Sequence, residues 1–184
     1  KGIGIYDVLA SNIGAIKIAK DLSMNIHGGF ALNIVNTYSL QFMKDIGLKD
    51  AELSFEMTLG DIKNLRGDIK RGIIGYGRLP LMLTRNCPAK NIKTGCKGCK
   101  KSSVIRDRKQ KEFPLMCQFG CTEILNSVPL YLADKQSEIN GIDFMVLRFT
   151  VENSVESVEI LNHFNNHAKK ANGITRGLYY RGVD

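Results

Sequence analysis

The sequence predicts an α/β protein whose strands and helices alternate along the chain. Four short apolar segments, at 1–10, 24–34, 50–57 and 71–84, have the residue pattern of β-strands, and amphipathic segments separate them. This alternation favours a parallel sheet or a (βα) barrel, because parallel strands need a crossover connection between them. A complete barrel needs about 250 residues, whereas the chain has 184. Two architectures therefore stay open, a partial TIM-like barrel and a smaller α/β sheet.

The separating segments carry the start and stop signals of helices. We expect helices at 11–22, 36–47 and 58–67. The first can be capped by Ser11 or Asn12, and the second ends at Gly47. The apolar face of the first helix is expected to be Ile13, Ile16 and Leu22. Within the second strand, Gly28 and Gly29 predict a bulge or a close approach of two backbones.

The alternation ends after residue 84. Residues 85–121 contain all five cysteines and little hydrophobic periodicity, so we expect an irregular, cysteine-rich insertion there. Within this segment, 103–117 has the pattern of a β-hairpin with a polar tip at 109–111. Residues 122–141 are expected to be partly helical around Pro129.

The last third of the chain returns to a strand followed by a helix. Residues 142–152 are rich in Phe and Val, which favours a strand. Residues 154–173 have the most complete helix pattern, with Ser154 as the expected N-cap, Glu156 in the first turn and Gly173 as the stop.

The composition is that of an ordinary globular protein, with 43% hydrophobic residues and 24% charged residues. It predicts a single α/β domain over residues 1–184. No apolar run reaches the roughly 18–20 residues of a membrane span, and no secretory leader is recognisable. An odd number of cysteines argues against a disulfide framework, so we expect a reducing, cytoplasmic location and no membrane contact. The chain begins with Lys1 rather than Met, so a processed product and a fragment of a longer protein both stay open as expectations.

The cysteines have the spacing of a metal or cluster site. Their order is Cys87-x8-Cys96-x2-Cys99-x17-Cys117-x3-Cys121. A CxxC pair offers two thiolates from one tight turn, and both zinc and an iron–sulfur cluster accept four thiolates. A zinc ribbon would contain a second CxxC pair, and a thioredoxin-type redox pair would stand without other cysteines. The spacing leaves open which four cysteines bind, with unligated thiols as the alternative.

Positive charge is concentrated around the same cysteines. Residues 85–111 hold ten Lys or Arg residues and one acid, Asp107, in a chain of net charge +8. Such a segment is either a solvated loop or an anion site, and RNA is the largest candidate partner.

Several motifs resemble peptidase family U32, the collagenase-like protease family. They are "YGRLPLMLTRNCP", "GCKGC", "RDRKQKEFPL" and "EILNSVPLYL", and "VLASNIGAI", "GGFALNIVNTYS", "AELSFEMTLGDI" and "TRGLYYRGV" extend the resemblance along nearly the whole chain. The resemblance implies a (βα)-barrel module, of which this chain would be the C-terminal portion, about the last half to two-thirds. An open sheet edge would then be covered by the missing N-terminal half or by a homodimer partner.

The resemblance also implies a cofactor and a reaction. Some relatives bind a [4Fe–4S] cluster through four cysteines and take part in oxygen-independent hydroxylation of RNA bases or of ubiquinone precursors. In those relatives a ligand cysteine directly follows the Gly-Arg of the "GR" strand, whereas Leu79 follows Gly77-Arg78 here. The implied ligands are therefore Cys87, Cys96 and Cys99, completed by Cys117 or Cys121.

Two other functions stay open. The family name implies a peptidase, although the sequence has neither an HExxH motif nor a nucleophile elbow. His163 and His167 lie one helical turn apart with no matching acid, so we expect a surface or core role for them. A non-catalytic domain held together by a structural zinc is the second alternative. The chain alone, as a fragment, is expected to be inactive.

Arg78 and Glu152 are the candidate catalytic residues, because each lies near the end of a predicted strand, where barrel active sites form. Arg78 can hold the carboxylate or phosphate of a small anionic substrate. Its alternative is a buried ion pair with Glu52 or Glu56. Glu152 ends the strand at 142–152 and is a candidate acid.

Overall fold

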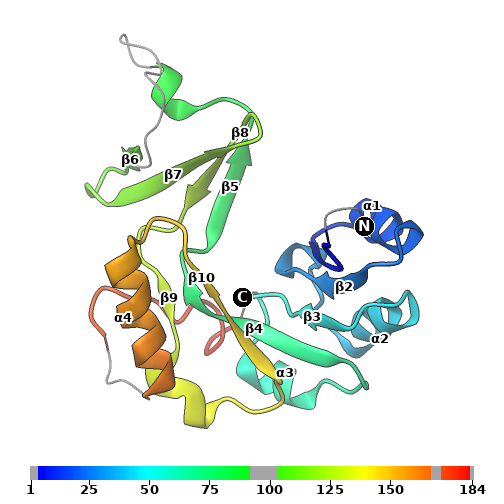
Figure 1. Cartoon of the computed structure of the whole chain (residues 1–184). Coiled ribbons are helices and arrows are strands. Elements are labelled where there is room, and N and C mark those ends of the chain that lie inside the picture. Colours follow the sequence, from blue (N-terminus) through cyan, green and yellow to red (C-terminus); the bar gives the residue numbers. More distant parts are fainter. Residues whose placement is uncertain (1–3, 92–102, 167–170, 183–184) are drawn as a thin grey trace. The chain divides into compact units, whose positions relative to one another are not determined.

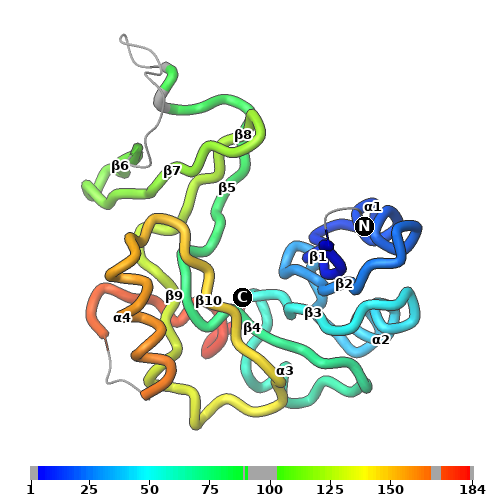
Figure 2. The backbone as a smooth tube through the Cα atoms, in the orientation of Figure 1, coloured from blue at the N-terminus to red at the C-terminus, as the bar shows by residue number. Residues whose placement is uncertain are grey.

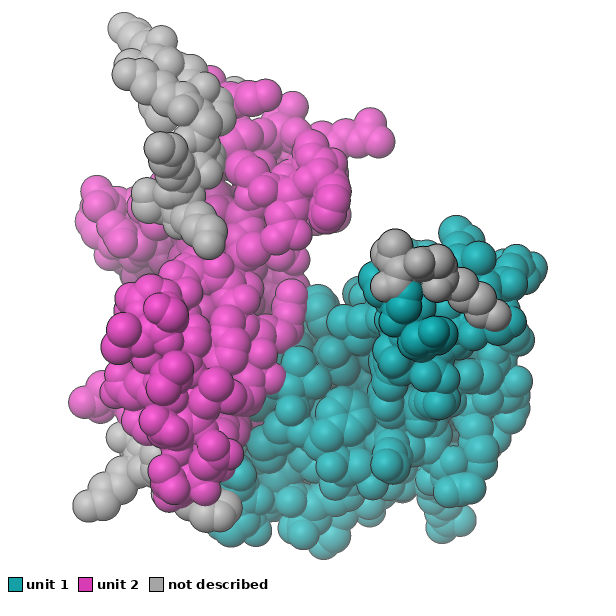
Figure 3. Space-filling model, in the orientation of Figure 1, with its two compact units in different colours: residues 1–75, 135–146, 176–184 teal, residues 76–134, 147–175 magenta. Residues whose placement is uncertain are grey.

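The computed structural model describes residues 4–91, 103–166 and 171–182. The chain forms two compact units, which Figure 3 distinguishes by colour. Unit 1 comprises residues 1–75, 135–146 and 176–184, and unit 2 comprises residues 76–134 and 147–175. The expectation of a single domain stays a prediction.

Unit 1 is built on a parallel sheet (Figure 1). Its strands are β1 (Asp7–Ala10), β2 (Asn25–Gly28), β3 (Asp50–Glu52) and β4 (Lys70–Gly77), and the last of these continues into unit 2. They pair in chain order and in parallel, and β10 (Phe144–Arg148) is the next strand beyond β4. The intervening helices are α1 (Ile13–Asp21), α2 (Thr37–Asp45) and α3 (Leu59–Asn64). The predicted alternation and the parallel sheet are confirmed, and the strands of the described residues form an open sheet rather than a closed barrel.

Strand β4 is buried over most of its length. Residues 72–77 of β4 are all buried, as expected for a parallel strand that is covered on both faces. Helix α1 packs against β1 and β2, and α2 packs against β3. At Gly28 the close neighbours are side chains rather than a second backbone, because a Cβ atom there would lie 2.8 Å from Leu48 Cδ2.

The first helix begins where the sequence predicts but buries a different face. Asn12 caps α1, and its side chain accepts a hydrogen bond of 2.8 Å from the backbone N–H of Ala15. Ile16 is buried as expected, but Ala19 is the other buried residue. The predicted apolar face was wrong for Ile13 and Leu22, which are 53% and 49% exposed.

Unit 2 contains an antiparallel sheet and a long helix (Figure 2). The sheet consists of β5 (Pro80–Thr84), β6 (Val104–Arg106), β7 (Glu112–Gln118) and β8 (Cys121–Leu125), in the order β5-β8-β7-β6. Strand β9 (Leu130–Tyr131) pairs with the end of β4, Tyr76 opposite Tyr131. Helix α4 (Ser154–Asn165) follows β10. Three 3₁₀ turns complete the described elements, at Phe30–Leu32, Pro88–Asn91 and Ala133–Glu138.

Both hairpins of this sheet are formed by turns with residues at positive φ. The predicted hairpin at 103–117 is confirmed, since β6 pairs with β7 and the Asp107 carboxylate accepts hydrogen bonds from two backbone N–H groups in the turn. The second hairpin, β7–β8, was not predicted. Its turn holds Phe119 at φ 49° and Gly120 at φ 77°, and a Phe at positive φ is not a signal that sequence analysis would recognise.

Three further expectations about elements were wrong. The strand predicted at 71–84 is two strands, β4 and β5. Strand β4 ends at Gly77, because this residue has φ 134° and lies against the backbone of Arg148. The segment 122–141 is extended through β8 and β9 and then forms a 3₁₀ turn, since burial of apolar residues such as Leu130 favours strand pairing there. The N-cap of α4 is Asn153 rather than Ser154.

No helix within the described part of the chain has the length and apolar character to cross a bilayer.

Candidate functional site

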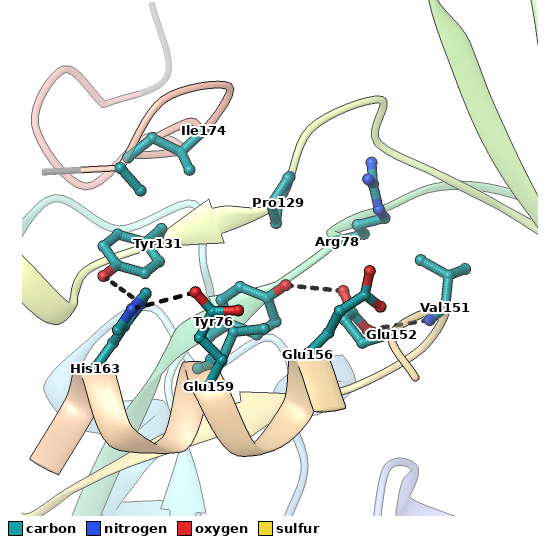
Figure 4. Close-up of a pocket in the computed structure, with 12 residues that line it drawn as sticks. Tyr76, Arg78, Pro129, Tyr131, Val151, Glu152, Glu156, Glu159, His163 and Ile174 are labelled. Carbon is teal, nitrogen blue, oxygen red and sulfur yellow. Dashed lines mark hydrogen bonds and ion pairs between the residues drawn. The ribbon is translucent and has the colours of Figure 1, made fainter. Parts of the chain in front are cut away.

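A cavity of about 360 Å³ lies within unit 2, and both candidate catalytic residues line it (Figure 4). Arg78 follows β4, and Glu152 precedes the N-terminus of α4. The remaining lining residues are Tyr76, Pro129, Tyr131, Val151, Glu156, Glu159, Ile160, His163, Ala171 and Ile174. The structure thus brings together two residues that the sequence analysis selected separately.

Glu152 is held in a fixed orientation by three hydrogen bonds. Its Oε1 accepts from the hydroxyl of Tyr76 at 2.9 Å. Its Oε2 accepts from the backbone N–H groups of Thr150 and Val151, at 2.7 Å and 3.1 Å. Burial of the Tyr76 hydroxyl, and then its bond to Glu152, raise the pKa of Tyr76 above its ordinary value. Tyr76 is therefore a protonated hydrogen-bond donor at neutral pH.

Arg78 is held by the backbone rather than directed at the cavity. Its Nη1 donates to the carbonyl oxygens of Asn126 and Ser127. Its Nε is buried and has no hydrogen-bond partner among the described residues. In Figure 4 the guanidinium group points away from Tyr76 and Glu152.

His163 is a site residue that the sequence analysis missed. Its Nδ1 lies 3.2 Å from the hydroxyl of Tyr131, and its Nε2 lies 3.9 Å from Oε1 of Glu159. The expectation that no acid accompanies this histidine was therefore wrong. Glu159 and His163 are four residues apart on α4, so the helical spacing was the available signal, whereas nothing in the sequence links Tyr131 to α4. The other histidine of that pair, His167, lies outside the described residues.

The chemistry available in this cavity is proton transfer and hydrogen bonding. Carboxylates, one imidazole and two phenols face it, and no Ser, Thr or Cys is among its described lining residues. General acid–base roles are therefore available to these groups, and the described lining offers no Ser or Thr hydroxyl or Cys thiol as a nucleophile.

A second cluster in unit 2 consists of two thiols. Cys87 is buried and precedes the 3₁₀ turn at Pro88–Asn91, and Cys117 lies on β7. Their Sγ atoms are 3.9 Å apart, about twice the 2.05 Å length of a disulfide bond. The Cys117 Sγ also lies 3.4 Å from Oγ1 of Thr122.

The strand register separates Cys121 from this pair. Cys117 is opposite Thr122, and Gln118 is opposite Cys121. Because neighbouring side chains on a strand point to opposite faces, Cys117 and Cys121 lie on opposite faces of the hairpin. Cys121 instead lines a second hollow, of about 290 Å³, together with Phe119 and Glu123.

The thiol pair has the spacing of two ligands on one metal ion. Zinc binds four sulfurs tetrahedrally at about 2.3 Å, which places neighbouring sulfurs about 3.8 Å apart. In a [4Fe–4S] cluster each thiolate binds a different iron, and the sulfurs stand further apart. No three potential ligands of the described residues form a metal site by themselves, and Cys96 and Cys99 lie outside those residues.

Comparison with known proteins agrees with the resemblance noted in the sequence. A family model described as Peptidase family U32 matches residues 1–103, more than half of the 184-residue chain. The match includes Arg78 and Cys87, whereas Cys117, Glu152 and His163 lie beyond it. Comparisons with curated proteins and with solved structures gave no match. The chain belongs to peptidase family U32.

Proposed function

We propose that the chain carries a thiolate-ligated metal or iron–sulfur centre whose ligands are Cys87, Cys96, Cys99 and Cys117. The observation that carries this proposal is the 3.9 Å separation of the Cys87 and Cys117 sulfurs, which come from segments 30 residues apart. The opposite orientation of Cys121 makes it the spare cysteine.

Two kinds of centre accept four thiolates. A [4Fe–4S] cluster supplies redox chemistry when bound, as the family resemblance implies. A single zinc fits the spacing of the pair more directly and would act as a structural staple. The two centres differ in iron and sulfide content, so analysis of the protein distinguishes them.

The cavity at Arg78 and Glu152 is the proposed substrate site. In this proposal the enzyme modifies RNA or a small aromatic substrate by oxygen-independent hydroxylation, as its family resemblance implies. Glu152, fixed by Tyr76 and by two N–H groups, would orient a hydrogen-bonding group of the substrate. His163 would hold or move a proton at Nε2, with Tyr131 fixing the ring through Nδ1. The cationic segment 85–111 would contact RNA outside the cavity.

The fold would then be part of a larger barrel. The parallel strands β1 to β4 and their helices have the βα order of a barrel section, and β1 is an edge strand within the described sheet. The missing N-terminal half or a second copy of the chain would cover that edge.

A peptidase is the alternative function, and the Tyr131–His163–Glu159 array favours it. Because the described lining of the cavity has no Ser, Thr or Cys, peptide cleavage there would require a water nucleophile activated by a carboxylate or the imidazole. Cleavage of gelatin by the pure chain that is abolished by His163→Gln would establish this alternative.

Anaerobic purification tests the proposed centre. About four irons and four sulfides per chain, with visible absorption, would identify a [4Fe–4S] cluster, and about one zinc would identify a staple. Cys87→Ser and Cys117→Ser should each lose most of the metal, whereas the matched variant Cys121→Ser should retain it. Equal metal loss in all three variants, or no metal in the unmodified chain, would contradict the ligand set. Hydroxylation assays on RNA and on small aromatic compounds then test the reaction.

A further inference from the structure

The cavity on α4 has an excess of negative charge. Glu152, Glu156 and Glu159 bring three carboxylates to its lining, and none of the described residues that line it is a lysine. Arg78 brings one positive charge, but its Nη1 is bound to two backbone carbonyls and its Nε is buried. The cavity therefore has a net negative charge, whereas the anion site that the sequence suggested for Arg78 would need a net positive charge.

Aromatic and apolar groups form the rest of the lining. The rings of Tyr76 and Tyr131 meet edge to face, with centroids 6.4 Å apart. Their hydroxyl groups contact Glu152 and His163, and both side chains are buried, so they form the floor of the cavity. Ile160, Ile174 and Ala171 add apolar surface.

We propose that this cavity binds a cationic group, a primary ammonium or a guanidinium, attached to a small apolar or aromatic body. The three carboxylates attract such a group and repel a carboxylate or phosphate, and the apolar part of the lining can contact the body of the ligand. This inference shares one premise with the proposed function, namely that this cavity is the substrate site.

The size of the cavity limits the ligand. A volume of about 360 Å³ lies near the lower end of the range for small-molecule sites, about 300–1,000 Å³. It accommodates one lysine-sized side chain or one small aromatic amine. A phosphate backbone would have to contact another part of the chain.

Calorimetric titration of the full chain with matched probes tests the proposal. The cationic probe is Nα-acetyl-lysine amide, the neutral probe is Nα-acetyl-norleucine amide, and the anionic probe is Nα-acetyl-glutamate amide. We expect the lysine probe to bind about tenfold more tightly than the norleucine probe, and its affinity to fall as salt is added. The cation can come from a free small-molecule amine or from the side chain of a peptide, and a parallel titration with 1,5-diaminopentane separates the two. Binding of the diamine that is tighter than that of the lysine probe identifies a free amine. Weaker binding of the diamine identifies a peptide side chain.

Glutamine variants connect the binding to this cavity. Glu156→Gln and Glu159→Gln should each weaken the lysine probe about threefold or more, and glutamine at 156 can still complete the helix cap. Glu123→Gln is the matched control, because it makes the same charge change in a different hollow of unit 2. Equal binding of the neutral probe, tighter binding of the anionic probe, or an equal loss in Glu123→Gln would overturn the proposal. Probe binding that persists in metal-free Cys87→Ser would separate this result from a failure of the proposed metal centre.

Discussion

His27 is placed where its protonation stabilises unit 1. Its Nδ1 lies 2.8 Å from Oδ2 of Asp50, and its Nε2 lies 3.2 Å from Oδ1 of Asp7. The bond to Asp50 raises the pKa of His27 above its ordinary value of 6.5. The bonds from Asn25 and His27 lower the pKa of Asp7 below its ordinary value of 3.8.

These two shifts predict a pH window of maximal stability. The contribution of His27 is complete below its ordinary pKa of 6.5 and is lost as pH rises through the raised folded value. The contribution of Asp7 is present above 3.8 and is lost as pH falls through the lowered folded value. The free energy of unfolding, measured in urea, should therefore be highest between about pH 3.8 and pH 6.5. His27→Gln should remove the decline on the alkaline side, and an unchanged decline would contradict the assignment to His27.

The bond between Tyr76 and Glu152 predicts a shift in a phenol titration. Glu152→Gln replaces the carboxylate that raises the pKa of Tyr76, so that pKa should fall in the variant. Titration of ring-labelled tyrosine by NMR measures the change. Glu123→Gln, which alters a carboxylate outside the cavity, should leave the Tyr76 resonance at its original midpoint.

Among the elements, the break between β4 and β5 depends on one glycine. Gly77 has φ 134°, and a Cβ atom there would lie 2.5 Å from the carbonyl oxygen of Arg148. Gly77→Ala should therefore lower the free energy of unfolding by about 2 kcal/mol or more. Gly47→Ala is the control, since Gly47 has φ 98° and no atom within 4 Å of the added Cβ. If both variants lose the same stability in urea, the contact with Arg148 has no role.

Helix α4 depends on a cap that the sequence analysis assigned one residue too late. The side chain of Asn153 accepts hydrogen bonds from the N–H groups of Val155 and Glu156. Asn153→Ala should cost about 1 kcal/mol of stability and speed amide exchange in the first turn of α4. Ser154→Ala should change stability by less than about 0.5 kcal/mol. A larger loss of stability in Ser154→Ala than in Asn153→Ala would identify Ser154 as the cap.

The sequence predicted the secondary structure correctly where the local residue pattern and the long-range packing favour the same conformation. Strand and helix alternation predicted the parallel sheet, and the turn around Asp107 was recognisable from its polar residues. The extended segment after Leu125 was not predicted, because pairing with distant strands, not local propensity, decides its conformation.

The candidate site was likewise only partly predictable. Arg78 and Glu152 were selected from predicted strand ends, and they do line one cavity, although β10 ends at Arg148, before Glu152. Nothing local indicated that the guanidinium would be bound to loop carbonyls, or that Tyr131 would meet His163. Those contacts exist only after β9 pairs with β4.

At the scale of the whole molecule, the distribution of charge predicts where a polyanion binds. Ten of the 26 Lys and Arg residues lie within 85–111. The double variant Lys109→Glu/Lys111→Glu should bind single-stranded RNA roughly three- to tenfold more weakly, with a smaller salt dependence, in fluorescence anisotropy. Lys17→Glu/Lys20→Glu makes the same charge change on α1. Equal losses in the two variants would indicate a response to net charge alone.

The pairing register of the β7–β8 hairpin has a consequence for folding. A slip of one residue would turn Cys117 to the face that now holds Cys121 and remove it from Cys87. The proposed ion would therefore bind only the correctly paired hairpin. Ion binding during folding would thus select the native register, because the ion would stabilise the correctly paired hairpin and not the pairings that are shifted by one residue.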